Sequence, residues 1–389
     1  MTLQISAHHV IRYLLVASFF LTSAITHAAN NIPAAPALAA KGYVLLDFNS
    51  GQVIAENESM QRMEPASLTK MMSTYVISNE LKAGNITLED KVTISKKAWR
   101  MPGSRMFVEV GKQVSVEKLL KGIIIQSGND ATVAMAEFIA GGEDAFASLM
   151  NNYAKQLGMN STHFVNSTGL PDAEHYTTPH DMAILGSALI RDFPEHYKWY
   201  AIKKFTFNNI TQYNRNKLLW RDKSVDGIKT GHTEAAGFCL VSSGVRDDMR
   251  LVAVVLGTKS DSARIQESQK ILNYGFRFYR SHKLYDANTE ISKTDIWKGV
   301  ADTVSLGLLK DLYVTIPRGQ YKQLKPSINF ESIIEAPINK HAVLGNLQVK
   351  IGDRIIAERS LVALHEIEQG GLWKRLVDWF ILLIKGWFG

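Results

Sequence analysis

The pattern of apolar and polar positions divides the chain into segments of different secondary structure. Apolar runs at residues 43–48 and 52–56 flank a short turn, which predicts a pair of strands. Residues 67–82 contain neither Gly nor Pro and are followed by Gly84, as expected of a helix. Strands at both ends of this region, with helices between them, predict an α+β domain in which helices pack on one antiparallel sheet. Further helices are predicted at 116–126, 131–140 and 260–279, and further strands at 227–230, 237–242 and 250–256.

The start of one more helix can be assigned to a residue. Thr178, Pro179 and Asp181 follow the order of a hydroxyl at the N-cap, a proline in the first turn and an acid at the third helical position. The hydroxyl can accept a hydrogen bond from a free N–H group of the first turn. We therefore expect a helix to begin at Pro179.

Beyond about residue 285 the apolar positions fall into short runs typical of strands. These runs lie at 312–316, 343–351 and 355–364, and turn residues separate them. Residues 286–366 are therefore predicted to form a small all-β module. Its sequence contains no cluster of candidate catalytic side chains, so we expect it to act as a spacer or scaffold.

The end of the chain has a strongly amphipathic pattern. Residues 372–388 fit a helix whose apolar side chains share one face, with charged side chains opposite. The uninterrupted apolar run at 379–384 is too short to span a bilayer. Residues 367–389 are therefore predicted to lie in the plane of a membrane interface as an anchor; the alternative is a helix docked on the β module. The apolar face comprises Leu372, Trp373, Leu376, Val377, Phe380, Leu383, Ile384 and Trp387, and the charged residues are Lys374, Arg375, Asp378 and Lys385.

The first residues have the composition of a secretory signal peptide. A weakly basic start that includes Arg12 precedes an apolar run at 13–25. This run of roughly 13 residues is shorter than the roughly 20 that a transmembrane helix needs. Small residues around Ala28 form a cleavage site, so residues 1–28 are predicted to be removed on export. The α+β domain then spans residues 29–285.

Composition and charge narrow the classes of partner. Hydrophobic residues make up 46% of the chain and charged residues 21%, as in ordinary globular proteins. The net charge of +7 suits an anionic lipid or cell-wall surface. The basic residues are scattered and form no run, so no nucleic acid is expected as a partner. Cys239 is the single cysteine and lies in an apolar run, which excludes an intramolecular disulfide and indicates a buried thiol.

The first candidates for chemistry are Ser67 and Lys70, at the start of the predicted helix 67–82. Positions i and i+3 share a helix face, so the ammonium can lie beside the hydroxyl. A lysine whose pKa is lowered by burial or by a neighbouring cation can act as the base that activates a serine. The same spacing recurs at Ser115 and Lys118, where it indicates an N-cap followed by solvated helix residues. This motif alone is therefore not specific.

Two further motifs make the chemistry more specific. Ser127 and Asn129 lie in a turn after the predicted helix 116–126, where a hydroxyl can relay a proton and a carboxamide can bind a substrate amide. Lys229, Thr230 and Gly231 lie on a predicted strand, whose edge can bind an extended peptide. Lys229 and Thr230 can bind a carboxylate, and Gly231 permits close approach of a ligand.

In this order, the three motifs resemble those of the serine penicillin-recognising enzymes. The resemblance is greatest to the low-molecular-mass D-alanyl-D-alanine carboxypeptidases of the type-5 group, and it covers the mature chain, including the β module and the tail. It implies a β-lactamase/transpeptidase-like domain with helices on both sides of an antiparallel sheet. It also implies a hydrolase that removes the terminal D-alanine from peptidoglycan pentapeptide stems. The strings that carry it are EPASLTKMM at 64–72, QSGNDA at 126–131, NRNKLLW at 214–220 and VDGIKTGHT at 225–233.

The resemblance implies a role for each motif residue in the chemical step. Ser67 would be the acylated nucleophile and Lys70 its base. Ser127 and Lys229 would complete the route of the proton, and Asn129 would bind the substrate backbone. No metal or organic cofactor is implied.

The resemblance also implies how the substrate terminus and the inhibitors bind. Thr230 and His232, with Arg215 nearby, would hold the terminal carboxylate. The backbone N–H groups of Ser67 and His232 would form the oxyanion hole. β-Lactam antibiotics would acylate the enzyme covalently, and the protein would work peripherally on the periplasmic face of the bacterial inner membrane.

Three alternatives remain at this point. A β-lactamase of the same fold often has a glutamate followed four residues later by an asparagine, whereas residues 160–181 contain Glu174 without that asparagine. A transpeptidase or endopeptidase could use the same motifs. A catalytically silent wall-binding protein could keep the fold.

Overall fold

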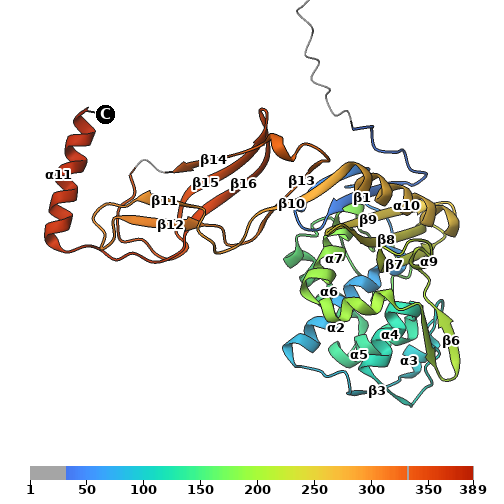
Figure 1. The fold of residues 1–389 in the computed structure, drawn as a ribbon. Helices are drawn as coiled ribbons and strands as arrows, with labels where there is room; N and C mark the ends of the chain where they lie inside the picture. Colours follow the sequence, from blue (N-terminus) through green and yellow to red (C-terminus); the bar gives the residue numbers. More distant parts are fainter. Residues whose placement is uncertain (1–31, 331–332, 389) are drawn as a thin grey trace, which may run out of the picture. The chain divides into compact units, whose positions relative to one another are not determined.

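The computed structural model describes residues 32–330 and 333–388 (Figure 1). The predicted signal peptide, residues 1–28, lies outside the described residues. The described chain begins its regular structure at β1, Gly42–Asp47, and ends in α11, Leu372–Phe388.

The α+β domain is built on one antiparallel sheet with the strand order β2-β1-β9-β8-β7. β1 and β2 come from the start of the domain and the other three strands from its end, as the sequence predicts. Strand β7 is the last strand on its side, so its outer edge is available to the site described below. The strands are β2 (Val53–Asn57), β7 (Val225–Thr233), β8 (Gly237–Arg246) and β9 (Met249–Thr258).

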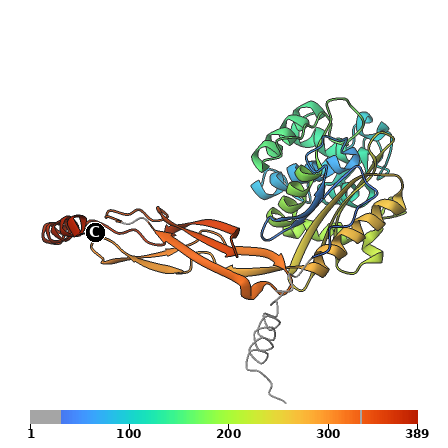
Figure 2. The ribbon, with the colours of Figure 1, turned by 90° about the horizontal axis from the view of Figure 1, so that it is seen from above.

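Helices cover both faces of this sheet (Figures 1 and 2). Helix α10, Asp261–Phe278, packs through Gly275 against Leu251 of β9. Helix α7, Pro179–Asp192, packs through Gly186 against Val252, the next residue along β9. Successive side chains of a strand point to opposite faces, so α7 and α10 lie on opposite sides, as the resemblance implies.

Helix α7 begins at the predicted residue. The Thr178 hydroxyl accepts a hydrogen bond of 3.1 Å from the Asp181 N–H group, and Pro179 occupies the first turn. The N-cap prediction is therefore confirmed.

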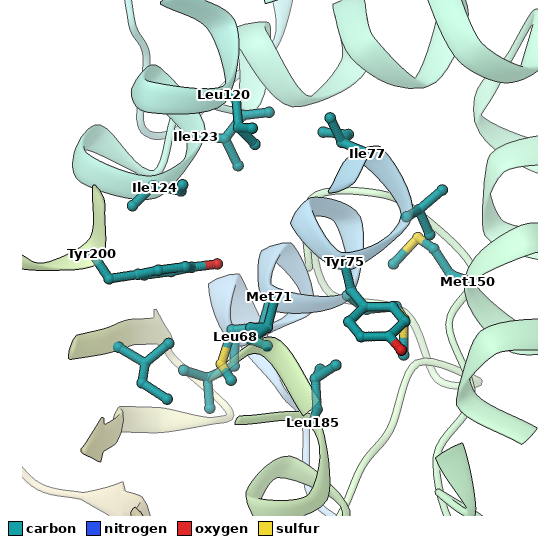
Figure 3. Packing of buried hydrophobic residues seen from close by; sticks show 14 of the residues in the cluster. Leu68, Met71, Tyr75, Ile77, Leu120, Ile123, Ile124, Met150, Leu185 and Tyr200 are labelled. Carbon is teal, nitrogen blue, oxygen red and sulfur yellow. The ribbon is translucent and has the colours of Figure 1, made fainter. Parts of the chain in front are cut away.

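Helix α2, Thr69–Ala83, runs through the core of a helical lobe beside the sheet (Figure 3). Every residue from Thr69 to Ser78 is buried, and Met71, Tyr75 and Ile77 point into the apolar cluster that Figure 3 shows. The helix ends at Gly84, whose φ of +74° gives the left-handed cap that glycine allows without strain. A helix with no exposed face over its first turns holds its side chains rigidly, which matters for Lys70 in the first turn.

The predicted helix 116–126 changes character halfway. It is α-helical in α4, Val116–Lys121, and continues as a π-helical turn, η2, over Gly122–Gln126. Ser127 follows in the left-handed conformation, with φ of +62°. Such wide turns are common at functional sites, and this one turns the chain so that Ser127 leaves the helix axis.

Other parts of the domain differ from the prediction in extent. Helix α6, Glu143–Leu157, was not predicted, although Phe146, Met150 and Ala154 bury one face at the spacing of a helix. The remaining elements are η1 (Ala66–Leu68), β3 (Lys91–Thr93), α3 (Lys96–Arg100), β4 (Gln113–Ser115), α5 (Asn129–Ala140), α8 (Pro194–Tyr197), η3 (Lys198–Ala201), β5 (Lys204–Phe207), β6 (Ile210–Tyr213) and α9 (Leu218–Arg221).

The C-terminal region is all-β up to its last helix, as predicted. A sheet with the strand order β11-β12-β16-β15-β14 has its own core, to which Leu306, Leu347 and Leu361 belong. Strands β10 and β13 pair separately. The strands are β10 (Tyr279–Tyr285), β11 (Ser292–Asp295), β12 (Thr303–Gly307), β13 (Leu312–Pro317), β14 (Leu324–Phe330), β15 (Val343–Ile351) and β16 (Arg354–Ala363), with η4 at Tyr321–Gln323.

Helix α11 covers the predicted residues, and its polar face contacts the β module. The buried Asp378 carboxylate accepts a hydrogen bond of 2.6 Å from the Lys298 N–H group, and Lys374 forms an ion pair with Asp302. The apolar face stays exposed: Trp373 is 78% and Phe380 58% accessible. Across the described residues, none of the helices combines the length and apolar character needed to cross a membrane.

Candidate active site

A cavity of about 360 Å³ opens between the first turn of α2, the outer edge of β7 and the turn after η2. The three motifs predicted from the sequence meet here, although up to 164 residues separate them along the chain. The cavity is lined by Ser67, Ser104, Ser127, Arg215, Lys217, Thr230, Gly231, His232, Phe238, Asp261 and Arg264.

Ser67 lies in the 3-10 turn η1 directly before α2, and Lys70 lies in the first turn of α2, so the α-helix begins two residues later than predicted while the two side chains still lie side by side. The distance from Lys70 Nζ to Ser67 Oγ is 3.2 Å. Lys70 is fully buried, whereas Ser67 is partly open to the cavity. Ala66, the residue before the serine, has a φ of +47°, which is an unfavourable conformation for a residue with a side chain. The strained turn places the serine hydroxyl at the surface of a buried helix.

The surroundings of Lys70 lower its pKa from 10.5 to about 7. Burial is the largest cause because it disfavours the charged ammonium, and the nearby Arg215 charge acts in the same direction, while Asp130 opposes them. A large fraction of Lys70 is therefore neutral near pH 7, as a base beside a serine must be.

The main chain of Thr168 gives Lys70 its shortest polar contact. Lys70 Nζ donates a hydrogen bond of 2.6 Å to the Thr168 carbonyl, which belongs to the segment from Val165 to His175, here called the 165–175 loop. A neutral amine that donates one N–H to this carbonyl still has a lone pair to accept the Ser67 proton. Sequence analysis did not identify the loop, because a carbonyl contact leaves no side-chain signature.

Ser127 and Asn129 flank the turn that follows η2. Within the described residues, Ser127 Oγ and Asn129 Oδ1 are buried and have no hydrogen-bond partner. Asn129 Nδ2 donates a hydrogen bond of 2.6 Å to the Pro102 carbonyl, which fixes the orientation of the amide. Because unpaired buried polar atoms cost stability, these two oxygens point to a ligand that completes their bonding.

Strand β7 carries Lys229, Thr230 and Gly231 along the cavity. Lys229 is buried, and its pKa is well below the ordinary value because of burial first and then the charges of Lys70, Arg215 and Arg264. A side chain at Gly231 would lie 2.9 Å from the Pro65 carbonyl. Gly231 therefore allows the turn that carries Ser67 to pack on β7, which is a different reason for glycine from the ligand approach expected from the sequence.

Arg215 and His232 complete the cationic end of the cavity. Arg215 Nε donates a hydrogen bond of 3.2 Å to the carbonyl of Gln126, the residue before Ser127. His232 lies on the exposed end of β7, and its ring is 3.9 Å from that of Phe238, measured between centroids. Six of the nine predicted site residues line the cavity, and the other three, Lys70, Asn129 and Lys229, lie beside lining residues.

Comparison with known proteins decides the family. Residues 29–260 match the family described as D-alanyl-D-alanine carboxypeptidase, and residues 279–369 match the C-terminal domain of penicillin-binding protein 5. The chain belongs to the D-alanyl-D-alanine carboxypeptidases. It is thus a hydrolase of the low-molecular-mass penicillin-binding class, and the recognition made from the three motifs is confirmed.

Two relatives match this carboxypeptidase over most of its length, and a third matches about three fifths of it. D-alanyl-D-alanine carboxypeptidase DacA of Escherichia coli (strain K12) is 44% identical over 92% of this chain and 91% of its own. Penicillin-binding protein 5 from Haemophilus influenzae superposes with a TM-score of 0.84 at 41% identity, covering 86% of this chain and 99% of its own. Penicillin-binding protein D2 from Listeria monocytogenes, solved with ampicillin bound, has a TM-score of 0.57 at 26% identity, covering 62% of this chain and 98% of its own.

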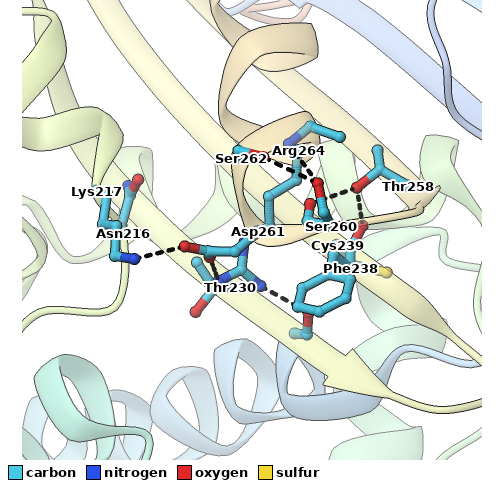
Figure 4. A network of polar contacts seen from close by, with 12 residues as sticks. Asn216, Lys217, Thr230, Phe238, Cys239, Thr258, Ser260, Asp261, Ser262 and Arg264 are labelled. Atoms are coloured by element: carbon cyan, nitrogen blue, oxygen red, sulfur yellow. Dashed lines mark hydrogen bonds and ion pairs between the residues drawn. The ribbon is translucent and has the colours of Figure 1, made fainter.

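The carboxypeptidase site contains a charged network that the sequence analysis missed (Figure 4). Arg264 of α10 donates a hydrogen bond of 3.0 Å to the Gly231 carbonyl and pairs with Asp261. Asp261 also pairs with Lys217, at 2.7 Å. The buried guanidinium therefore supports β7 at Gly231 and, as part of the cavity lining, adds positive charge to it. Arg264 lies in a mostly polar stretch of the predicted helix 260–279, so its sequence resembles a solvated helix face.

Two further residues bear on the open alternatives. Glu174 is exposed and is absent from the cavity lining, so it does not occupy the position of a deacylating base near Ser67. Cys239 is buried in the core, as predicted, and burial raises its pKa to about 11. The described residues contain no group of three or more His, Cys, Asp or Glu placed to hold a metal ion.

Proposed function

We propose that this protein removes the terminal D-alanine from peptidoglycan stem pentapeptides through an acyl-enzyme on Ser67. The observation that carries the proposal is the buried Lys70 amine, with a pKa of about 7, lying 3.2 Å from Ser67 Oγ. The cavity beside this pair has Arg215 and Thr230 in its lining, as a substrate that ends in a carboxylate requires.

In the acylation step, Ser67 Oγ attacks the carbonyl carbon between the two D-alanines while its proton passes to the Lys70 amine. The negative charge that develops on the carbonyl oxygen is stabilised by the backbone N–H groups of Ser67 and His232. The peptide bond then breaks, and the departing amine takes a proton through the Ser127 hydroxyl from the Lys70 and Lys229 pair. The unpaired Ser127 Oγ supports this relay, because it has no competing partner within the described residues.

In the deacylation step, a water molecule takes the position that the departing D-alanine amine occupied. Lys70 takes a proton from the water while the water oxygen attacks the acyl carbon. The ester bond to Ser67 then breaks, Lys70 returns the proton to Ser67 Oγ, and the shortened peptide leaves as its carboxylate. Asn129 holds the peptide amide of the substrate throughout. Because Lys70 is the base in both steps, no carboxylate base is needed, which agrees with the exposed position of Glu174.

The cationic end of the cavity sets the specificity for a free terminal carboxylate. Arg215, Thr230 and Arg264 all line the cavity, and Arg264 also donates a hydrogen bond to the Gly231 carbonyl of β7. Burial is the main reason for the lowered pKa of Lys70 and of Lys229, and the Arg215 charge lowers both further. Arg264 acts in the same direction on Lys229.

We expect the purified protein to release D-alanine from a soluble peptide ending in D-Ala-D-Ala and to leave the D-Ala-L-Ala isomer and the C-terminal amide uncleaved. Released D-alanine is measured with D-amino acid oxidase. Cleavage of the isomer or the amide would release L-alanine or D-alaninamide, so it is measured as shortened peptide by chromatography. Benzylpenicillin should block the release by labelling one site, which peptide mass mapping should locate at Ser67. Cleavage of the amide at the same rate, or a label on another residue, would contradict the proposal. A cross-linked peptide dimer, tested in parallel, separates carboxypeptidase from endopeptidase activity.

The protein works outside the cytoplasm at a membrane surface, with residues 1–28 as the export signal and α11 as the anchor. Three features support α11 as the anchor. The apolar face of α11 is exposed, with Leu372 83% and Trp373 78% accessible. The polar face is held on the β module by Asp378 and Lys374, so the apolar face is presented outward. The net charge of +7 favours anionic lipid.

Substituting Phe380, on the exposed face of α11, by Asp should weaken binding to vesicles of anionic phospholipid by about tenfold or more, because insertion of a large apolar side chain is lost. Removing residues 372–389 should abolish binding. Both variants should cleave the soluble peptide at the rate of the unmodified protein. Vesicle co-sedimentation measures the binding, and Met60→Asp, which changes an equally exposed apolar residue of the α+β domain, is the matched control. Full vesicle binding without residues 372–389 would rule out α11 as the anchor.

A further inference from the structure

The position of the Lys70 amine depends on the 165–175 loop. Lys70 Nζ is 2.6 Å from the Thr168 carbonyl and 3.2 Å from Ser67 Oγ. A shift of the carbonyl would turn the amine away from the serine, because a buried amine follows its best acceptor. The residues that hold this loop on α2 therefore control the geometry of proton transfer.

Local contacts shape the part of the loop around Thr168. Asn166 Oδ1 accepts hydrogen bonds from the N–H groups of Thr168 and Gly169, and the Ser167 carbonyl accepts one of 2.6 Å from Ser73. Gly169 packs so closely that a side chain there would lie 1.8 Å from the Ala66 carbonyl. The loop is thus pressed onto the turn that carries Ser67, with no space for adjustment.

His175 joins the two ends of the loop to α2. Its Nδ1 is 3.1 Å from the Val165 nitrogen, and its Nε2 is 2.7 Å from Oγ1 of Thr69, the residue before Lys70. A backbone N–H can only donate, so Nδ1 must accept. The proton of the neutral ring is therefore on Nε2, which donates to Thr69. The ring is 2% exposed and packs edge-on against Phe164.

We propose that His175 is a positioning residue that keeps the Thr168 carbonyl, and through it the Lys70 amine, in line with Ser67. His175 does not line the cavity and touches no reacting atom. Its imidazole ring connects three parts of the structure: Val165 at the start of the loop, His175 itself at the end of the loop, and Thr69 in the first turn of α2.

The electrostatics agree with this role. Burial lowers the pKa of His175 to about 4, with His163 and Lys70 acting in the same direction and Asp172 opposing them. The ring therefore stays neutral in the pH range where Lys70 titrates, and the bond from the Val165 N–H is kept. The charged groups that act on Lys70 itself are Arg215 and Asp130, and Lys70 in turn lowers the pKa of Lys229, which is lowered mainly by burial.

His175→Leu should lower the second-order rate constant for acylation by benzylpenicillin by at least about tenfold, because the reacting groups are misplaced. It should also move the acid limb of the pH–rate profile upward from about 7, because a loosened loop admits water to Lys70 and its pKa rises toward 10.5. His175→Gln keeps a donor at the position of Nε2. It should therefore restore most of the acylation rate and return the acid limb to about pH 7. The KM for the soluble peptide should change little, since Arg215 and Thr230 are untouched.

Two other variants separate this role from a structural one. Thr69→Val removes only the hydroxyl that accepts from His175 and should move the limb in the same direction; it decides the question if His175→Leu does not fold. His163→Leu removes another histidine ring, which contacts the Glu174 carbonyl of the loop but, within the described residues, makes no hydrogen bond to α2. This variant should leave the acylation rate and the acid limb unchanged. Rates are taken per active site, counted by penicillin titration. The proposal would be overturned if the acid limb of the pH–rate profile stayed at about pH 7 in both His175→Leu and Thr69→Val. An equal upward shift of the limb in His163→Leu would overturn it too.

Discussion

Replacing Ser67 by Ala should reduce the release of D-alanine by at least about 10⁴-fold in kcat/KM, because no other group can form the acyl-enzyme. Labelling by penicillin should disappear in the same variant. The fold should be retained, since within the described residues the Ser67 side chain makes one hydrogen bond, the one from Lys70. Stopped assays of D-alanine and fluorescent penicillin labelling measure the two effects, and the melting temperature checks the fold.

The chain offers a matched control in Ser115, which has the same spacing to a lysine. Ser115 caps α4, where its hydroxyl accepts a hydrogen bond from the Lys118 N–H group. Ser115→Ala should cost about 1 kcal/mol of stability through the lost cap and leave activity unchanged. A Ser67→Ala enzyme that still binds penicillin covalently would show that another serine is the nucleophile.

Sequence reasoning located the chemistry because each motif depends on local geometry. The spacing of Ser67 and Lys70, the turn at Ser127 and the strand at Lys229 follow from short-range rules. The structure has the turn and the strand as expected, and it brings Ser67 beside Lys70 although the serine lies in the 3-10 turn before α2. The duplicate at Ser115 could be set aside only because the other motifs accompany Ser67. The structure shows the physical difference, since Lys118 is exposed and Lys70 is fully buried.

The contacts that tune the site could not be read from the sequence. The Thr168 carbonyl is a main-chain group that any residue type supplies. Arg264 and Lys217 both pair with Asp261. Lys217 lies 44 residues before Asp261 in the chain, and no helical or strand period relates the two positions. The direction in which α11 presents its faces was also open, because an amphipathic helix can bury either face. Here Asp378 makes the polar face the docked one.

Substituting Lys70 should produce the second large effect, a loss of acylation. The pH dependence of the unmodified enzyme should show whether the neutral or the charged form of Lys70 is active. Lys70→Met keeps the length and the burial of the side chain but removes the base, so acylation should fall by about 10³-fold or more. Lys70→Arg should be no better, because a guanidinium stays protonated. Lys118→Arg, at the exposed lysine of the second motif, should behave like the unmodified protein.

In the unmodified enzyme, kcat/KM should rise with pH up to about 7 and then level off. The sign follows from the role of the amine: a base must be unprotonated, so the rate falls about tenfold for each pH unit below its pKa. Burial and Arg215 lower the pKa of Lys70 to about 7, so the loss begins there and not near 10.5. Because kcat/KM reports the free enzyme, a bound carboxylate does not disturb the measurement. An acid limb above pH 9 would mean that Lys70 is charged at neutral pH, and proton abstraction would then need a different base.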